Sequence, residues 1–202
     1  AIDINGYDKV EPTTSNITIE VSGNEIIFYY TKRTDLSYTV KYLEQETNKV
    51  LAEEKNVNSQ TFQATVTEQA IDIEGYTKVN PEETITIEVS GNEIIFYYKK
   101  VEGLTYTVNY YEKGTENAVA EKKTVDGKTF EEQVTEQAIE VEGYNKVEPA
   151  EKTITIGMEE NVINFYYTKR VDLTYTVKYL EQGTDSELSE TKTVNNQTYK
   201  ST

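Results

Sequence analysis

The chain has no cysteine, no histidine and no tryptophan among its 202 residues. Without cysteine no disulfide can stabilise a small domain, and without cysteine and histidine a structural zinc site has only carboxylate ligands. The same two absences remove the usual general base and thiol nucleophile of enzymes. Acidic pairs such as Glu131-Glu132 and Glu159-Glu160 are expected by chance among 36 acidic residues. We therefore expect no enzyme activity, no metal site and no cofactor.

Long apolar runs and positive charge are also scarce. No apolar run approaches the roughly 18 residues of a membrane span, so we expect no membrane insertion in this region. Lys and Arg total 20 against 36 Asp and Glu, a net charge of −16 that is spread evenly along the chain. An even negative surface argues against nucleic acid and against anionic membranes as partners. The chain starts at Ala1 without a signal peptide, and we expect it to be a window of a longer polypeptide.

What the sequence does contain is repetition. The segment 104–112, Leu-Thr-Tyr-Thr-Val-Asn-Tyr-Tyr-Glu, has close copies at 36–44 and 173–181. A period of 68 to 69 residues indicates tandem small domains. Within the segment, Tyr106 and Val108 alternate with polar residues, which is the pattern of a strand with one buried face.

The repeat admits two phases. In the first, two complete units at 36–103 and 104–172 are flanked by the second half of a repeat at 1–35 and the first half at 173–202. In the second, three units begin at Ala1, Ala70 and Ala138. Similarity between copies does not choose between them, so the strand pattern has to.

In the unit 104–172, the pattern predicts a first hairpin, a short helix, a strand and a second hairpin. The helix prediction rests on the spacing of Phe130, Val134 and Ala138 and on a Thr129–Glu132 capping box. The other predicted elements are strands at 104–112, 118–125, 143–147, 153–158 and 162–167.

The first and last strands are the most apolar, so we expect them to be central and parallel. Comparison of the copies places Ile163, Phe165 and Tyr167 on the inner face of the last strand. A helix across one face would make this an α+β, mostly β, β-grasp (ubiquitin-like) fold. The arrangement selects the first phase. The short linker 168–172 predicts a stiff, elongated rod of roughly 100 Å for three repeats, from strands about 30 Å long.

Several motifs resemble one known family. Tyr-Thr-Val-(Lys/Asn)-Tyr, Gly-Tyr-(Asp/Thr/Asn)-Lys-Val and the terminal Ile-x-Phe-Tyr-Tyr are similar to the MucBP (mucin-binding protein) repeat of Gram-positive surface proteins. The resemblance implies a β-grasp-like module in secreted, cell wall-attached, extracellular adhesins, several of which engage mucus glycoproteins. The partners it implies are host mucin glycans or glycoproteins, together with neighbouring repeats of the same chain.

Tyrosine is unusually abundant, with 17 copies. We expect six of them to pack in cores: Tyr38, Tyr42, Tyr106, Tyr110, Tyr175 and Tyr179. Tyr29, Tyr97 and Tyr166 should instead face outward from the last strand, where an aromatic platform can stack on a sugar. They are the candidate glycan-binding residues, with cross-strand packing or contact with a neighbouring domain as alternatives.

Repeated polar residues offer one more alternative. Lysines recur after Gly-Tyr, and asparagines recur in the last turn, so a Lys–Asn isopeptide cross-link could replace the missing disulfides. The residues concerned are Lys9, Lys78 and Lys146, and Asn24, Asn92 and Asn161.

Three functions follow from the repetition. The repeats can be a stalk that holds a distal domain away from the cell wall, or an adhesin whose many weak sites gain avidity. In the third, residues 173–202 of one molecule complete residues 1–35 of the next, giving head-to-tail extracellular filaments.

Overall fold

The computed structural model describes all residues from 1 to 202 and consists of strands and turns, without a helix. None of its elements is therefore a helix with the length and apolarity to cross a membrane. The chain divides into two compact units, Ala1–Val101 and Glu102–Thr202, which are described separately.

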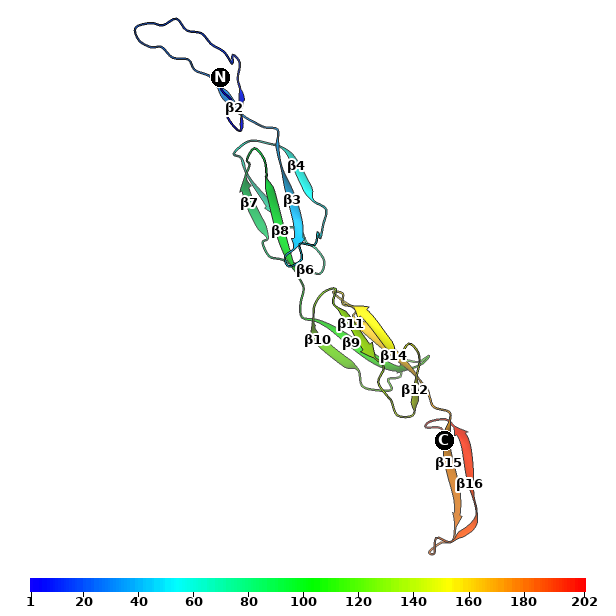
Figure 1. Ribbon diagram of the computed structural model, residues 1–202. Coiled ribbons are helices and arrows are strands. Elements are labelled where there is room, and N and C mark those ends of the chain that lie inside the picture. The colour runs from blue at the N-terminus through cyan, green and yellow to red at the C-terminus, as the bar shows by residue number, and fades with distance from the viewer. The chain divides into compact units, whose positions relative to one another are not determined.

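The first unit contains eight strands (Figure 1). In chain order they are β1 (Tyr7–Lys9), β2 (Tyr30–Lys32), β3 (Leu36–Glu44), β4 (Lys55–Gln60), β5 (Thr65–Gln69), β6 (Tyr76–Lys78), β7 (Glu82–Thr86) and β8 (Glu93–Lys100). A four-stranded sheet has the order β4-β3-β8-β6, and β5 pairs with β7 in a second, two-stranded sheet. The central strands β3 and β8 are parallel, with Tyr42 opposite Phe96.

The second unit repeats this arrangement. Its strands are β9 (Leu104–Glu112), β10 (Lys123–Lys128), β11 (Gln133–Gln137), β12 (Tyr144–Lys146), β13 (Glu151–Thr155), β14 (Val162–Lys169), β15 (Leu173–Leu180) and β16 (Glu187–Gln197). The four-stranded sheet is β10-β9-β14-β12, and β11 pairs with β13. Parallel β9 and β14 place Tyr110 opposite Phe165. The prediction that the first and last strands lie side by side, parallel and central, is confirmed.

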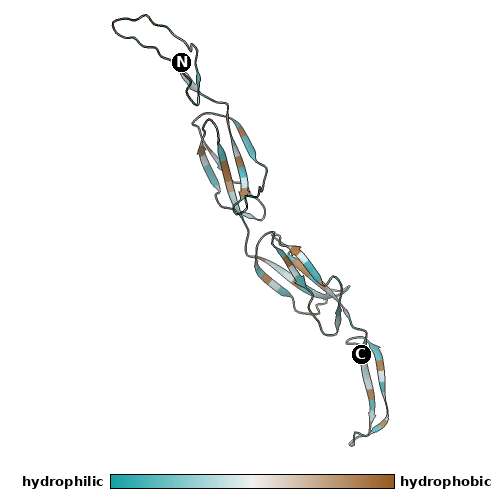
Figure 2. Cartoon of the chain, in the orientation of Figure 1, coloured by the Kyte–Doolittle hydropathy of each residue, from teal (hydrophilic) through white to brown (hydrophobic).

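Each core lies between the four-stranded and the two-stranded sheet. Phe96, Tyr98 and Val40 are fully buried in the first unit, and Phe165, Tyr167 and Val108 in the second. Apolar and polar residues alternate along the central strands, which Figure 2 shows as brown and teal bands. The predicted inner face of Ile163, Phe165 and Tyr167 is confirmed, because each is at most 1% exposed.

The helix predicted for 129–138 is wrong. The Thr129–Glu132 signal is real, since the Thr129 N–H donates to the Glu132 carboxylate (3.1 Å) and the Glu132 N–H to the Thr129 carbonyl (3.0 Å). These bonds close a turn in which Glu131 has φ +63°, outside the helical region. Strand β11 then follows, and its β-branched Val134 and Thr135 suit a sheet better than a helix.

The predicted second hairpin is also wrong. Strand β13 does not pair with β14; it pairs antiparallel with β11, placing Val134 opposite Ile154. The Thr135 and Thr153 hydroxyls hydrogen-bond across this pair (2.7 Å). In the first hairpin, the returning strand is antiparallel as predicted but begins at Lys123. The mostly β class is confirmed, whereas the α+β class is wrong and the β-grasp assignment is not confirmed, because a two-stranded sheet occupies the place of the helix.

The two ends of the chain form smaller pieces. Strand β1 pairs only with β2, and β15 only with β16. Four of the six tyrosines expected in cores are at most 6% exposed, but Tyr175 is 52% and Tyr179 45% exposed. The prediction is wrong for these two because β15 has no neighbour on its second edge, where β9 has β14.

Candidate functional site

Tyr97 and Tyr166 lie on the last strands β8 and β14 of their copies, as expected, whereas Tyr29 lies just outside strand β2. Tyr166 on β14 is 38% exposed, and Tyr97 at the same position of β8 is half-buried. Tyr29, just before β2, is 68% exposed, and its carbonyl accepts the Val10 N–H (3.0 Å). The three tyrosines therefore have different surroundings, although their sequence contexts are nearly the same.

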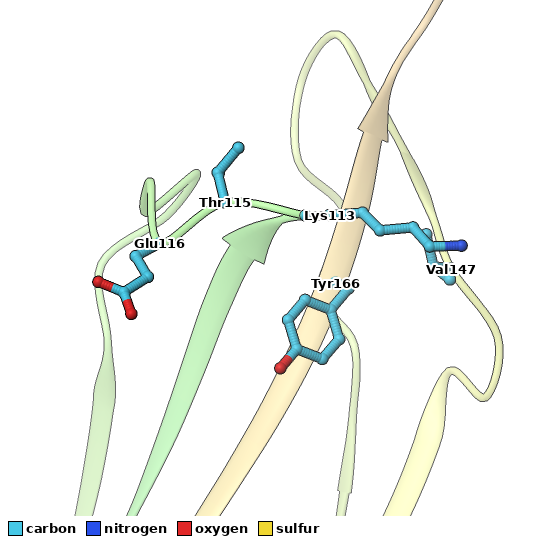
Figure 3. Close-up of a pocket in the computed structure, with 6 residues that line it drawn as sticks. Lys113, Thr115, Glu116, Val147 and Tyr166 are labelled. Carbon is cyan, nitrogen blue, oxygen red and sulfur yellow. The ribbon is translucent and has the colours of Figure 1, made fainter.

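Around Tyr166, segments on both sides of the ring line a cavity. A cavity of about 530 Å³ is lined by Lys113, Gly114, Thr115, Glu116, Val147 and Tyr166 (Figure 3). Figure 3 shows the ring between the turn that carries Thr115 and Glu116 and the segment that carries Val147. Both walls are tied to β14, because the Lys113 N–H donates to the Tyr167 carbonyl (2.8 Å) and the Val147 N–H to the Tyr166 carbonyl (2.9 Å).

The face beside this cavity is aromatic and amide-rich. The Tyr111 and Tyr166 rings lie 6.5 Å apart at 37°. Lys152 Nζ lies 5.6 Å from the Tyr166 ring centroid and donates to the Asn164 carbonyl (2.6 Å). The Asn109 and Asn164 side chains hydrogen-bond to each other (2.9 Å). An aromatic surface edged by amides, an ammonium and a carboxylate offers stacking together with donors and acceptors.

The matching face of the first unit has different chemistry. Its cavity of about 390 Å³ is lined by Val79, Asn80, Glu83, Ile85, Glu93, Ile94, Ile95 and Tyr97. Where the second unit has Tyr111, Asn164 and Lys152, the first has Leu43, Ile95 and Glu83. The residues buried in the two cores are the same, whereas these three positions near the outward tyrosine differ.

Sequence reasoning missed a partly buried polar cluster that joins the two sheets. The Tyr106 hydroxyl donates to Glu136 (2.5 Å), and Lys123 Nζ donates to the same carboxylate oxygen (2.6 Å). Burial, reinforced by Glu136, raises the pKa of Tyr106 to about 12. Burial alone would raise the pKa of Glu136, but hydrogen bonds from Lys123 and Tyr106 outweigh it and lower that pKa.

The same group occurs in the first unit. Tyr38 and Lys55 both donate to Glu68, each at 2.6 Å. In both units the tyrosine precedes the carboxylate by 30 residues, and the lysine precedes it by 13. That repeated spacing was visible in the sequence. The group is structural, because each of its members already has a partner inside the repeat.

The structure does not bring the recurring lysines and asparagines together. Lys9, Lys78 and Lys146 pair with Asp3 (2.8 Å), Asp72 (2.7 Å) and Glu140 (2.6 Å) respectively. The asparagine amides instead close the last turn: Asn92 donates to the Glu88 carbonyl (2.8 Å) and Asn161 to the Gly157 carbonyl (2.9 Å). This arrangement does not support a Lys–Asn cross-link.

Comparison with known proteins adds little beyond this geometry. No family model and no curated protein matches the chain. Similar solved structures include the type 2 repeat of the mucus binding protein MUB from Lactobacillus reuteri, with 15% identity over 66% of this chain and 99% of that one and a TM-score of 0.24. The Bacillus anthracis TIE protein has 11% identity over 77% of this chain and 40% of its own, with a TM-score of 0.41. A streptococcal ancillary pilin has 10% identity over 83% and 76%, with a TM-score of 0.29. Repeats of mucus-binding proteins are thus among the similar structures, but at these TM-scores the likeness carries no argument about function.

Proposed function

We propose that the chain is part of a non-enzymatic stalk of an extracellular, wall-attached bacterial protein, with an accessory glycan contact at Tyr166. The observation that carries the stalk is the parallel pairing of the first and last strands of each repeat, β3 with β8 and β9 with β14. The limits 36–103 and 104–172 are part of this proposal.

Parallel terminal strands suit a protein under tension. A pull through the chain drags β9 toward the N-terminal side and β14 toward the C-terminal side, so the two strands slide along each other. The register runs from Thr107 opposite Val162 to Glu112 opposite Tyr167. Because all the hydrogen bonds of this register carry the load together, they must break at once rather than one after another.

The pulling direction tests the stalk. One sample is stretched through its termini, and a second through Glu116→Cys and Thr168→Cys, near one end of the β9–β14 pair, which peels the bonds apart in turn. The chain has no native cysteine to compete for attachment. We expect the repeat to resist a higher force when it is pulled through its termini. An equal or lower force would contradict a load-bearing role.

The glycan contact is placed at Tyr166 because of its neighbours. The Tyr166 ring lines a cavity together with Lys113, Thr115 and Glu116, whose side chains carry groups that can hydrogen-bond to sugar hydroxyls. Tyr97 and Tyr29 remain candidates of the same kind, but Tyr97 lines a smaller cavity and Tyr29 is largely open to solvent. Single contacts of this size are weak, so adhesion to host mucin glycoproteins depends on many repeats acting together.

A glycan and mucin array tests this contact. The probe is the 202-residue chain displayed at high density on beads, compared with its Tyr166→Ala and Tyr97→Ala variants. We expect Tyr166→Ala to lose most of the signal and Tyr97→Ala to retain most of it. No signal from the displayed wild type would remove the adhesin part and leave the stalk. Equal loss in both variants would remove the assignment to Tyr166.

A second candidate function is a head-to-tail filament. In the complete repeats Ile87 is fully buried and Tyr106 is 5% exposed, whereas the corresponding Ile19 and Tyr175 are 74% and 52% exposed. The apolar faces that are exposed in 1–35 and in 173–202 thus correspond to the two faces that pack against each other inside a complete repeat. Residues 173–202 of one molecule would then pair with residues 1–35 of a second.

Self-association tests the filament. Sedimentation velocity over a range of concentrations is compared for the wild type and a Tyr175→Asp, Tyr179→Asp variant. We expect concentration-dependent growth only in the wild type. A wild type that stays monomeric at the highest concentration, or a variant that associates equally, would remove this candidate.

A further inference from the structure

Gly6 lies against an aromatic ring that belongs to the following repeat. Its φ is +82°, and a Cβ added to it would lie 2.4 Å from Cδ1 and Cε1 of Phe62. Phe62 is 7% exposed and belongs to the core of the first unit. Tyr7 packs edge-on against the same ring, with centroids 5.6 Å apart at 76°. The Gly6-Tyr7 pair therefore forms a seat for the Phe62 ring.

The second unit contains the same seat, built from different residues. A Cβ on Gly143, whose φ is +78°, would lie 2.4 Å from Cγ, Cδ1 and Cδ2 of Tyr199. Because the three distances are equal, the added Cβ would lie over the face of the ring. Tyr144 packs edge-on against Tyr199, with centroids 5.6 Å apart at 70°. The contact is therefore made by a phenylalanine ring in the first unit and by a tyrosine ring in the second.

An arginine in the linker ties the seat to the ring. The Arg33 N–H donates to the Gly6 carbonyl (3.0 Å), and the Arg33 carbonyl accepts the Phe62 N–H (2.9 Å). Its guanidinium makes a two-pronged ion pair with Asp35 (2.8 and 2.9 Å). In the second unit, Arg170 bridges Gly143 and Tyr199 through the same backbone bonds, each 2.9 Å. One residue thus bonds both partners of the contact, so neither can move without breaking a hydrogen bond.

Other glycines of the chain provide the contrast. Gly23 and Gly114 also have positive φ, +79° and +82°, but an added Cβ would meet nothing within 4 Å. At those two positions glycine is needed only for the backbone turn. At Gly6 and Gly143 it is needed for the turn and for the close approach of a ring.

We infer that the Gly-Tyr loop of one repeat is a docking surface for the aromatic ring that follows the first hairpin of the next repeat. The partner of this surface is a neighbouring repeat of the same chain. Within the first unit residues 1–35 hold the repeat 36–103 in this way, and within the second unit the repeat 104–172 holds residues 173–202, each through a packed ring and two backbone hydrogen bonds in addition to the covalent linker. The inference rests on the repeat limits 36–103 and 104–172 of the proposed function, but it requires neither a load nor a ligand.

The ring current of the docked side chain gives a direct test by NMR of the full 202-residue chain. Protons over the face of an aromatic ring shift upfield, so the Hα resonances of Gly6 and Gly143 are expected upfield of those of Gly23 and Gly114. Phe62→Leu should abolish the shift of Gly6 and leave that of Gly143; Tyr199→Leu should do the reverse. Unshifted Hα resonances of Gly6 and Gly143 in the wild type would overturn the inference.

Backbone relaxation shows whether the contact restrains the linker. In Phe62→Leu we expect faster amide motion at Arg33 and Asp35, with relaxation at Arg170 unchanged as the internal control. The leucine fills part of the ring's volume, and the spectrum of β3 and β8 reports that the repeat still folds. Unchanged motion at Arg33 in a folded variant would show that the ring does not hold the joint.

Discussion

Truncation of Phe165 tests the core on which the repeat depends. Phe165 is 1% exposed, lies opposite Tyr110 on the neighbouring parallel strand and stacks on its ring at 6.2 Å. Replacing a buried phenylalanine by alanine costs about 3 to 5 kcal/mol. A 69-residue repeat at roughly 0.05 to 0.15 kcal/mol per residue has a free energy of unfolding of only about 3 to 10 kcal/mol. Phe165→Ala should therefore remove between a third and all of the stability of the proposed repeat 104–172.

Guanidinium unfolding followed by circular dichroism measures this loss, and amide NMR spectra identify the strands that are affected. We expect the signals of β9 and β14 to be lost while those of β3 and β8 persist, and Phe96→Ala to give the reverse pattern. Tyr166→Ala, one residue along and on the outer face, should change stability by no more than about 0.5 kcal/mol. A loss below about 1 kcal/mol for Phe165→Ala would refute the placement of this residue in the core.

Three further predictions follow from individual groups. Burial raises the pKa of Tyr167 to about 12, so the folded state favours the neutral phenol. The free energy of unfolding should therefore fall as the pH rises from about 10 toward 12. Tyrosinate absorbance and circular dichroism, recorded over the same pH range, measure the ionisation and the unfolding. The pKa of Glu136 is lowered in the folded state, so its carboxylate stabilises the fold above the unfolded-state pKa and ceases to do so as the pH falls through the folded-state pKa. Glu136→Gln should lower the free energy of unfolding by about 1.5 to 3 kcal/mol at neutral pH and make that free energy less dependent on pH in the acid range. Gly143→Ala should lower the melting temperature more than Gly114→Ala. Both substitutions introduce the strain of a positive φ, about 1 to 2 kcal/mol, but only the methyl group at position 143 meets an aromatic ring. Equal melting temperatures would contradict the Tyr199 contact.

The central strands could be predicted from sequence because their signal is repeated and redundant. Ile163, Phe165 and Tyr167 alternate with polar residues, and the copies show which positions tolerate change. Burial against a facing sheet is what fixes such positions, so alternation reports it directly. The parallel order then followed from placing the two most apolar strands together in one sheet.

The region of β11 could not be assigned from its residues, because two local patterns overlap there. Phe130, Val134 and Ala138 have helical spacing, while Val134, Glu136 and Ala138 are spaced by two residues, as on one face of a strand. The decision is made by tertiary contacts: Val134 pairs with Ile154 on β13, and Glu136 bonds Tyr106 on β9. Neither partner is close in the sequence, and secondary-structure propensities consider only neighbouring residues, so they could not predict these contacts.

The residues that surround Tyr166 likewise could not be predicted from the sequence pattern. The outward direction of the ring follows from alternation, but the walls of its cavity come from a turn and from Val147, which backbone hydrogen bonds hold beside β14. The difference between Tyr166 and Tyr97 could have been noticed, since Tyr111 and Asn164 replace Leu43 and Ile95 on the same face.

Stretching the chain through its termini while recording the length released tests the central claim, that the chain is a series of repeats clamped by their own first and last strands. A repeat of 68 residues gives roughly 220 to 245 Å of extended chain, less its folded length. We predict two separate unfolding events of nearly equal released length, each matching one repeat. A single release corresponding to the whole chain, or extension without a resisting event, would contradict the claim.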